Sequence, residues 1–348
     1  MVPDAERRAR PPRRLFCAPF GESTWIAALK DVDLLRLYWN GCAHAPWAEY
    51  AAKRFDAQNV SDAAPITMIN VGANKGYGAP AFLSLWSESL RARLRAKEWK
   101  WAIQRYARTD RPNKTHGFLI HTPDGPCHES SLRREAHTRE LPAQVHMLEL
   151  LAANRRLLRW LVNHTQIANA ARVYDYAVSN VTYTQPVIDG YAGVEYLSLS
   201  SQGKKSKAKP TMMQVLTVDD FMTRERINHA VWSVEIDTEG WDALVLEGMR
   251  GALREHRVLF VEFEYSSRGF WKQFKDRRTL YATQRWMGDL GYTCYLETSH
   301  DVAPISGHCW RDEFEASRWS NVVCTHSEIL HDMAQEGYAR RIALKKPS

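Results

Sequence analysis

The chain has 348 residues, of which 45% are hydrophobic and 25% charged. This is the composition of an ordinary globular protein, long enough for one large domain or two smaller ones. No stretch approaches the roughly 20 apolar residues that a membrane-spanning helix needs, so we expect no transmembrane segment. The net charge is +7, and residues 91–114 alone carry nine Lys or Arg against Glu98 and Asp110. The excess positive charge therefore belongs to one segment.

The cysteines and the N-terminus set the expectations about location. None of the six cysteines forms a CxxC pair, and no His/Cys cluster has zinc-ligand spacing. We therefore expect packing thiols in a reducing compartment and no metal site. Residues 1–16 are rich in arginine but lack the apolar core of a secretory signal. We expect a cytoplasmic protein, and organelle targeting stays open although Asp4 and Glu6 argue against it.

Residues 1–60 are expected to form a basic tail followed by a helical extension. Apolar residues recur at helical spacing in two segments, STWIAALKDVDLLRLYWN and APWAEYAAKRF. The segment SDAAP then makes a break, and the apolar strand ITMINV follows at residues 66–71. Such a run is typical of a parallel strand covered on both faces. We therefore expect the main domain to span residues 61–330.

Residues 86–142 interrupt this pattern and look like a basic helical insertion. An apolar stripe at helical spacing runs through it: Ala92, Ala96, Trp99, Ile103 and Tyr106. The insertion is either a helical lid whose Lys and Arg face water or a patch for an acidic or nucleic-acid partner. In the second case residues 91–114 and 204–209 would form the patch.

From residue 143 onward, strands and helices alternate. Further strands are expected at 143–150, 171–179, 230–236, 257–265, 292–297 and 320–326. Helices are expected over 151–164, 241–256 and 279–291. This alternation predicts an α/β fold with a mainly parallel sheet. Residues 331–348 are expected to be a C-terminal tail.

Two motifs follow the first two strands. In INVGANKG, Gly72 ends a strand and Gly76 precedes a helix, a pattern that lets the backbone turn tightly and approach a ligand. The spacing differs from the dinucleotide pattern G-x-G-x-x-G, and a tight turn without a ligand stays open. Glu149 closes the next strand, where an acidic side chain can accept the hydroxyls of a ribose. A carboxylate at a helix N-terminus is the alternative.

The third motif is VWSVEIDTEGWDALVLEG, residues 231–248. It places Asp237 and Glu239 at the end of the 230–236 strand, on the ligand side of such a sheet. Asp237 is the stronger candidate for holding substrate or taking a proton. Glu239 fits a helix start equally well, where an acid complements the helix dipole.

In order and content, these motifs resemble the FkbM-type S-adenosylmethionine-dependent methyltransferases. The segments that carry the resemblance are INVGANKGYG, VHMLEL, YDYAVSN, LTVDDFM, VEIDTEGWDALVLEGMRGAL and RVLFVEFEY. The resemblance covers about 66–85 and 144–325. It implies a Rossmann-like, seven-stranded sheet with helices on both faces and the last strand antiparallel.

The resemblance also implies where S-adenosylmethionine binds. The glycine turn would face its methionine part, Glu149 its ribose, Tyr176 and Ala177 its adenine, and Asp237 the sulfonium methyl group. The cofactor residues implied in this way are Asn70, Gly72, Ala73, Asn74, Gly76, Glu149, Tyr176, Ala177 and Asp237.

Four departures from the family pattern stand near these positions. Asn70 stands where the family often has aspartate, and Glu235 where lysine is common. Leu150 replaces a proline, and Trp241-Asp242 replaces a small residue followed by glutamate. The last change flanks the carboxylate most suited to touch substrate, which makes Trp241 a candidate substrate contact.

The resemblance implies methyl transfer to a hydroxyl group, often of a sugar or natural product. Holding an acceptor at attack distance can supply ~7–11 kcal/mol, and a general base adds roughly 10²–10⁴-fold. The catalytic candidates are Asp237, Glu239 and Glu264, followed by Glu262; His116 and His121 of the insertion are further candidates, His116 as a substrate contact. An RNA or DNA methyltransferase and a catalytically inactive scaffold of the same fold are the alternatives.

Overall fold

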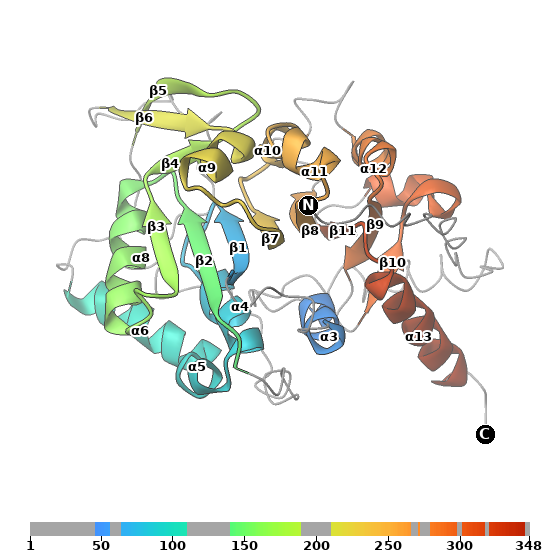
Figure 1. Ribbon diagram of the computed structural model, residues 1–348, viewed down its shortest axis with the longest axis horizontal. Helices are drawn as coiled ribbons and strands as arrows, with labels where there is room; N and C mark the ends of the chain where they lie inside the picture. The colour runs from blue at the N-terminus through green and yellow to red at the C-terminus, as the bar shows by residue number, and fades with distance from the viewer. Residues whose placement is uncertain are drawn as a thin grey trace, which may run out of the picture.

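A computed structural model describes residues 46–55, 64–109, 140–188, 210–265, 271, 279–297, 301–316 and 320–344. The strands of its main sheet are β1 (Ile66–Val71), β2 (Ala143–Leu148), β3 (Ala171–Tyr174), β7 (Val231–Ile236), β8 (Val258–Tyr265), β9 (Thr293–Glu297), β10 (Val302–Pro304) and β11 (Ser320–Thr325). They lie in the order β10-β9-β11-β8-β7-β1-β2-β3 (Figure 1).

The strand directions confirm the predicted architecture. β3, β2, β1, β7 and β8 are parallel to one another, whereas β11 is antiparallel to both β8 and β9. Among the described residues, this sheet has eight strands rather than the expected seven. The additional strand, β10, pairs antiparallel with β9 at the sheet edge. Its three residues are too few to show a recognisable alternation in sequence.

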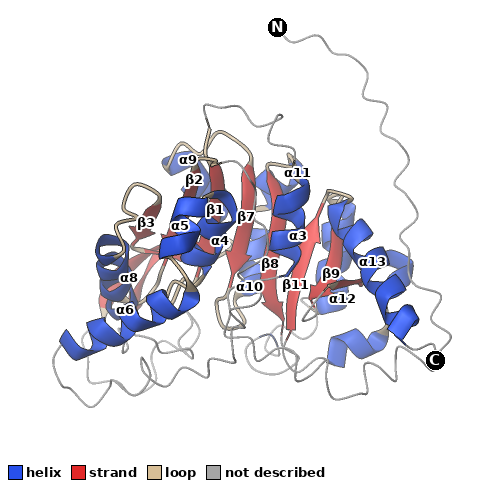
Figure 2. Ribbon diagram, turned by 90° about the horizontal axis from the view of Figure 1, so that it is seen from below, coloured by secondary structure: helices blue, strands red, loops and turns tan. Residues whose placement is uncertain are grey.

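Helices cover both faces of this sheet (Figure 2). One face carries α3 (Pro46–Arg54), α4 (Gly78–Trp86), α6 (Ala96–Thr109), α8 (Ala152–His164) and α13 (Ile329–Leu344). The other carries α9 (Val218–Arg224), α10 (Asp242–Glu247), α11 (Arg250–Arg254) and α12 (Leu280–Asp289). The remaining helices are α5 (Glu88–Arg93), η5 (Gly307–Cys309) and η6 (Asp312–Ala316). With both faces covered, all six residues of β1 are buried, as its apolar run predicts.

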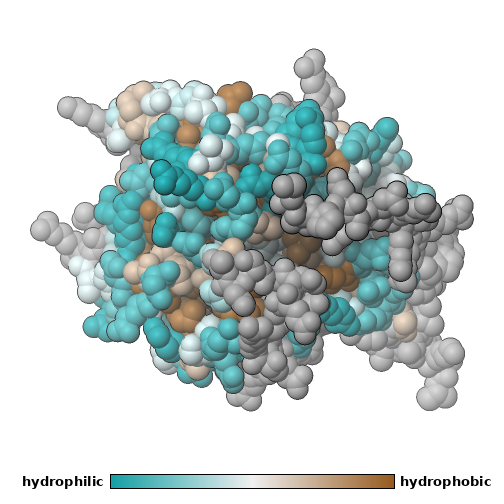
Figure 3. All heavy atoms as spheres, viewed as in Figure 1, coloured by the Kyte–Doolittle hydropathy of each residue, from teal (hydrophilic) through white to brown (hydrophobic). Residues whose placement is uncertain are grey.

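The C-terminal region is a helix rather than the expected tail. The segment expected as a C-terminal tail contains α13, which packs against β10 and α3. In the part of the chain that the structure describes, no helix has the length and apolar character to cross a bilayer. The surface in Figure 3 is mostly hydrophilic, with apolar residues in small separate patches.

The strand expected over 171–179 is divided between two sheets. β3 pairs with β2 as far as Tyr174, and Asp175 then forms an ion pair with Arg155 at 3.2 Å. The chain continues as β4 (Tyr176–Val178), which forms a second sheet with β6 (Thr211–Leu216) and β5 (Tyr183–Val187). The prediction of one continuous strand was therefore wrong at Asp175. The apolar pattern of a segment does not indicate which neighbouring strand each of its residues pairs with.

The basic insertion forms helices, and its predicted stripe is confirmed in part. Trp99, Ile103 and Tyr106 of α6 are buried in the core. Ala92 lies in the separate short helix α5 and is exposed, so it does not extend the stripe. The change of direction between the two helices moves Ala92 off the buried face of α6.

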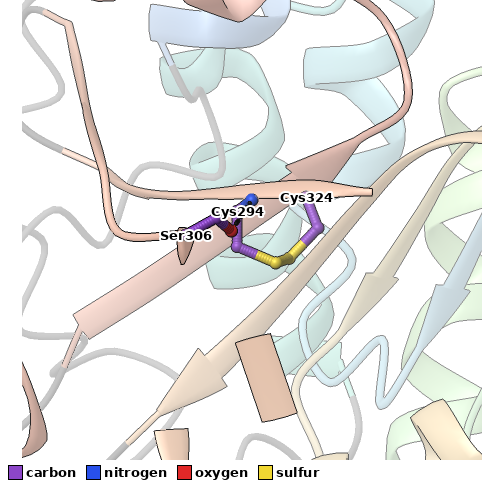
Figure 4. Close-up of a disulfide and its surroundings, with 3 residues drawn as sticks. All are labelled: Cys294, Ser306 and Cys324. Atoms are coloured by element: carbon purple, nitrogen blue, oxygen red, sulfur yellow. Dashed lines mark hydrogen bonds between the residues drawn. A yellow bond between two sulfur atoms is a disulfide. The ribbon is translucent and has the colours of Figure 1, made fainter. Parts of the chain in front are cut away.

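A disulfide corrects the expectation of free thiols. Cys294 and Cys324 are bonded to each other, and Cys309 is also disulfide-bonded. Cys294 and Cys324 face each other across β9 and β11, while the Cys294 N–H donates to the Ser306 hydroxyl oxygen at 2.8 Å (Figure 4). The two cysteines form a non-hydrogen-bonded pair of the antiparallel ladder, the kind of pair at which facing side chains lie closest. Disulfides are typical of oxidising compartments, so the argument from reduced thiols to the cytoplasm no longer holds.

The strand order identifies where a ligand site is expected. From β1 the chain extends the sheet on one side through β2 and β3, and on the other side through β7 and β8. The order in which strands are added to the sheet therefore reverses between β1 and β7. Open α/β sheets bind ligands at the carboxyl ends of their strands, beside such a switch point.

Candidate active site

The glycine turn lies directly after β1, at the switch point. Gly72, Asn74 and Gly76 have φ values of +83°, +45° and +74°, a left-handed backbone that favours glycine. The Gly72 N–H donates to the Leu148 carbonyl of β2 at 2.9 Å. A Cβ on Gly72 would lie 1.8 Å from the carbonyl oxygen of Asp237. The backbones after β1 and β7 are therefore in a contact that only glycine permits.

Replacing Gly72 with alanine should disrupt this turn. The left-handed φ alone costs about 1–2 kcal/mol, and the clash with Asp237 adds to it. We expect the free energy of unfolding to fall by at least ~2 kcal/mol in denaturant titrations. Gly288→Ala in α12 is the matched control, because a Cβ there meets no atom within 4 Å. Equal stability of the two variants would show that the turn can adjust.

Glu149 is tied to the glycine turn from β2. It is 4% exposed, and its two carboxylate oxygens accept the backbone N–H groups of Asn74 and Leu151, both at 2.7 Å. Burial raises the pKa of Glu149, while these two hydrogen bonds lower it. The Asn154 side chain donates a third hydrogen bond. A carboxylate has about four acceptor positions, so Glu149 retains capacity for a hydroxyl group.

The residues predicted to border adenine lie after the break between the sheets. Tyr176 begins β4, and its ring lies 5.0 Å from the Arg224 guanidinium of α9 and 6.2 Å from the Tyr174 ring. Ala177 is buried and packs with Leu150, which replaces the family proline. The second sheet therefore fixes both positions, and their adenine contacts stay a prediction.

Asp242 organises the carboxylates that follow β7. Its Oδ2 accepts the Thr238 hydroxyl and the Gly240 N–H, both at 3.1 Å, and its Oδ1 accepts the Glu264 N–H at 3.3 Å. It is fully buried, and burial together with the charge of Asp237 raises its pKa to about 7. Asp242 thus holds the turn carrying Asp237 against the end of β8. This role of Asp242 was not predicted, although an Asp four residues after Thr238 at a helix start is a sequence signal for it.

Asp237 and Glu264 lie together at this edge, and Asp237 is exposed. Burial, followed by the charges of Asp237, Asp242 and Glu239, raises the pKa of Glu264 well above its ordinary value, and the Glu264 side chain is hydrogen-bonded to Asp237. A protonated Glu264 can therefore donate to an ionised Asp237. Glu239 lies between them in sequence and has a left-handed φ of +56°. Asp237 and Glu239 thus both lie close enough to Glu264 for their charges to raise its pKa.

Glu262 belongs to a neighbouring set of contacts rather than to this one. Its carboxylate accepts the Trp47 indole N–H at 3.1 Å and the Asn321 amide at 3.3 Å. The same Trp47 N–H donates to Glu297 at 2.6 Å. Burial raises the pKa of Glu262 to about 7. Glu262 is therefore engaged in holding α3 to the sheet.

Two departures from the family pattern face each other in the structure. Asn70 of β1 is paired in register with Glu235 of β7, and its amide donates to the Glu235 carboxylate at 3.1 Å. A Cβ on Gly78, at the start of α4, would lie 2.4 Å from the Asn70 amide nitrogen. The Asn70 side chain is thus packed between β7 and α4, and its predicted cofactor contact stays a prediction.

The two predicted substrate contacts have different outcomes. The indole N–H of Trp241 donates to the Ser179 hydroxyl at 3.0 Å, so the ring is fixed to the segment after β4. Its contact with substrate stays a prediction. His116 and His121 lie outside the described residues, as does the 204–209 segment. Within the described ranges, no group of three or more His, Cys, Asp or Glu side chains is arranged to hold a metal ion.

Comparison with known proteins places this site in a family. The model of the methyltransferase FkbM domain matches residues 70–294. Among solved structures, a methyltransferase FkbM from Methylobacillus flagellatus KT is similar with a TM-score of 0.39 and 12% identity, over 81% of this chain and 48% of that chain. A human methyltransferase 10 domain containing protein gives a TM-score of 0.30 and 7% identity, over 85% of this chain and 83% of that chain.

The family model, rather than these distant structural similarities, supports the assignment. This chain spans about half the length of the Methylobacillus structure, with 48% covered. No curated protein gives a significant match. The family match begins at the glycine turn and extends through β7 and β8 into β9, so it includes the glycine turn, Glu149 and the carboxylates after β7. Because it covers more than half of the sequence, the chain belongs to the FkbM methyltransferase family.

Proposed function

We propose that this protein transfers a methyl group from S-adenosylmethionine to a hydroxyl group of a sugar or another small molecule. The observation that carries the proposal is the meeting of three motifs at the switch point. Asn74 of the glycine turn donates to Glu149, and Gly72 of the same turn packs against the Asp237 backbone. A buried glutamate after β2, a glycine turn after β1 and a hydrogen-bonded carboxylate pair after β7 and in β8 thus share one sheet edge.

Each part of this edge has a role in the proposed reaction. When bound, S-adenosylmethionine supplies a methyl group activated by its sulfonium. Glu149 would hold the ribose hydroxyls, and the backbone of the glycine turn would hold the methionine part. Asp237 would orient the acceptor hydroxyl and take its proton, a contribution of roughly 10²–10⁴-fold. Glu264 would stabilise that arrangement through its hydrogen bond to Asp237.

The outer face of α6 supports an acceptor that carries negative charge. Trp101 is 61% exposed, and the Lys97 ammonium lies 6.0 Å from its ring centre. Arg105 and Arg108 are exposed on the same helix. An aromatic ring among cations can stack on sugar or base rings while the cations bind anionic groups. The disulfides favour an anionic glycan over nucleic acid, because they are typical of compartments outside the cytosol.

Binding of the cofactor can be measured before any acceptor is known. A ligand at a hundredfold excess over its dissociation constant stabilises the folded protein by about 2.7 kcal/mol. We expect micromolar S-adenosylmethionine or S-adenosylhomocysteine to raise the melting temperature, whereas Glu149→Ala should bind more weakly. Adenosine monophosphate is the control for non-specific nucleotide binding. No shift at millimolar ligand would favour an inactive scaffold. Where the shift is seen, labelled transfer to anionic glycans compared with RNA separates the acceptor classes.

A further inference from the structure

Trp99 connects the basic insertion to the glycine turn. It lies on the inner side of α6 and has no exposed surface. Its indole N–H donates to the backbone carbonyl of Lys75 at 3.0 Å, in a buried hydrogen bond. Its ring also packs against the turn, since a Cβ on Gly76 would lie 3.3 Å from the Trp99 Cζ2. Trp99 therefore contacts the turn through both its ring and its polar atom.

The conformation of the turn gives this hydrogen bond a specific consequence. Lys75 lies between Asn74 and Gly76, which both have a left-handed backbone. The Lys75 carbonyl belongs to the peptide between Lys75 and Gly76, and the Gly76 N–H of the same peptide donates to the Ala73 carbonyl at 2.7 Å. A buried carbonyl needs a hydrogen-bond donor, and Trp99 supplies one. Fixing this peptide therefore holds the hydrogen bond that closes the turn from Ala73 to Gly76, and Asn74, whose N–H donates to Glu149, lies within that turn.

We infer that Trp99 is a positioning residue for the cofactor turn. Its indole N–H fixes the Lys75 peptide, and the turn then presents its backbone and Glu149 in the geometry that binds the cofactor. The inference rests on the proposed function, because it assigns a role within the same site. If the inference holds, the basic insertion contributes to cofactor binding. This role differs from the packing role and the partner-binding role that the sequence suggests for it.

The test removes the indole N–H while keeping an aromatic ring. Trp99→Phe should weaken binding of S-adenosylhomocysteine about tenfold by calorimetry, equivalent to about 1.4 kcal/mol. The KM for S-adenosylmethionine should rise by a similar factor, whereas kcat at saturating cofactor should change less than threefold. Trp286→Phe in α12 is the matched control, because this ring lies on the other face of the sheet, 5.4 Å from the Arg250 guanidinium. Its affinity should stay within twofold of the wild type.

A second variant separates positioning from packing. Incorporation of 3-benzothienylalanine at position 99 keeps the volume of the bicyclic ring and replaces the N–H with sulfur, so folding should be retained even if Trp99→Phe fails to fold. It should weaken binding about as much as Trp99→Phe. If the wild type binds S-adenosylhomocysteine and this variant binds it with the same affinity, the inference about Trp99 is overturned while the proposed function stands. If the wild type binds neither nucleoside, the proposed function fails and the inference fails with it.

Discussion

Replacing Asp237 with alanine is expected to lower turnover by roughly 10²–10⁴-fold, the contribution of a general base, while cofactor affinity stays near that of the wild type. The structure gives a reason for this separation. Asp237 touches the glycine turn through its backbone: its carbonyl packs on Gly72, and its N–H donates to Val71 at 2.9 Å. Its side chain is exposed at the strand end. Single-turnover rates and calorimetry with S-adenosylhomocysteine measure the two effects independently.

Glu239→Ala is the comparison that decides which carboxylate faces the acceptor. The charges of both acids raise the pKa of Glu264, the charge of Asp237 more than that of Glu239, and Asp237 is also hydrogen-bonded to Glu264. We therefore expect Glu239→Ala to retain more activity than Asp237→Ala. A greater loss in the Glu239 variant would assign the base to Glu239. A collapse of cofactor affinity in Asp237→Ala would instead place the Asp237 side chain in the cofactor site.

Removing the disulfide between Cys294 and Cys324 is expected to lower the free energy of unfolding by about 3–4 kcal/mol. The bond closes a segment with a sequence separation of 30. In the chain-entropy model, a crosslink over a loop of this length destabilises the unfolded state by about that amount. The double variant Cys294→Ala/Cys324→Ala should therefore unfold at a lower denaturant concentration than the oxidised wild type.

Reduced wild-type protein separates the crosslink from side-chain packing. Both cysteines are fully buried in the core beneath α12, so their truncation also leaves a small cavity. Reduction leaves both side chains in place but also opens the disulfide of Cys309, so both proteins are compared in reduced form. The difference in unfolding free energy between reduced wild type and reduced double variant then gives the packing contribution. The idea fails if mass spectrometry of the unreduced protein finds the two cysteines unlinked, or if reduction leaves the unfolding midpoint unchanged.

Much of the fold could be predicted because its signals are local. The apolar run of β1 is long and continuous since helices cover both faces, and the glycines that follow it are required by left-handed φ values. The disulfide depends on the register between β9 and β11, which brings together residues far apart in sequence. The separation of β3 from β4 depends on which partner each pairs with. Neither fact is present in a local pattern.

The candidate site shows the same division. Glu149 and Asp237 could be named from the sequence because each closes a predicted parallel strand, and such ends meet at one edge. Trp99 gave no such signal. In sequence it is one member of an apolar stripe, and its burial agrees with that interpretation. Only the position of α6 relative to the glycine turn shows that its N–H reaches the Lys75 carbonyl.

The pairing of Asn70 with Glu235 bears on which of these two positions departed from the family pattern first. Aspartate opposite glutamate would place two carboxylates side by side in a buried part of the sheet, where burial already raises the pKa of Glu235. Asparagine opposite lysine carries no such repulsion. A lineage that passed through Asp-to-Asn first would thus have avoided the costlier intermediate. Reconstructed ancestors of this branch should carry asparagine at position 70 before glutamate appears at position 235.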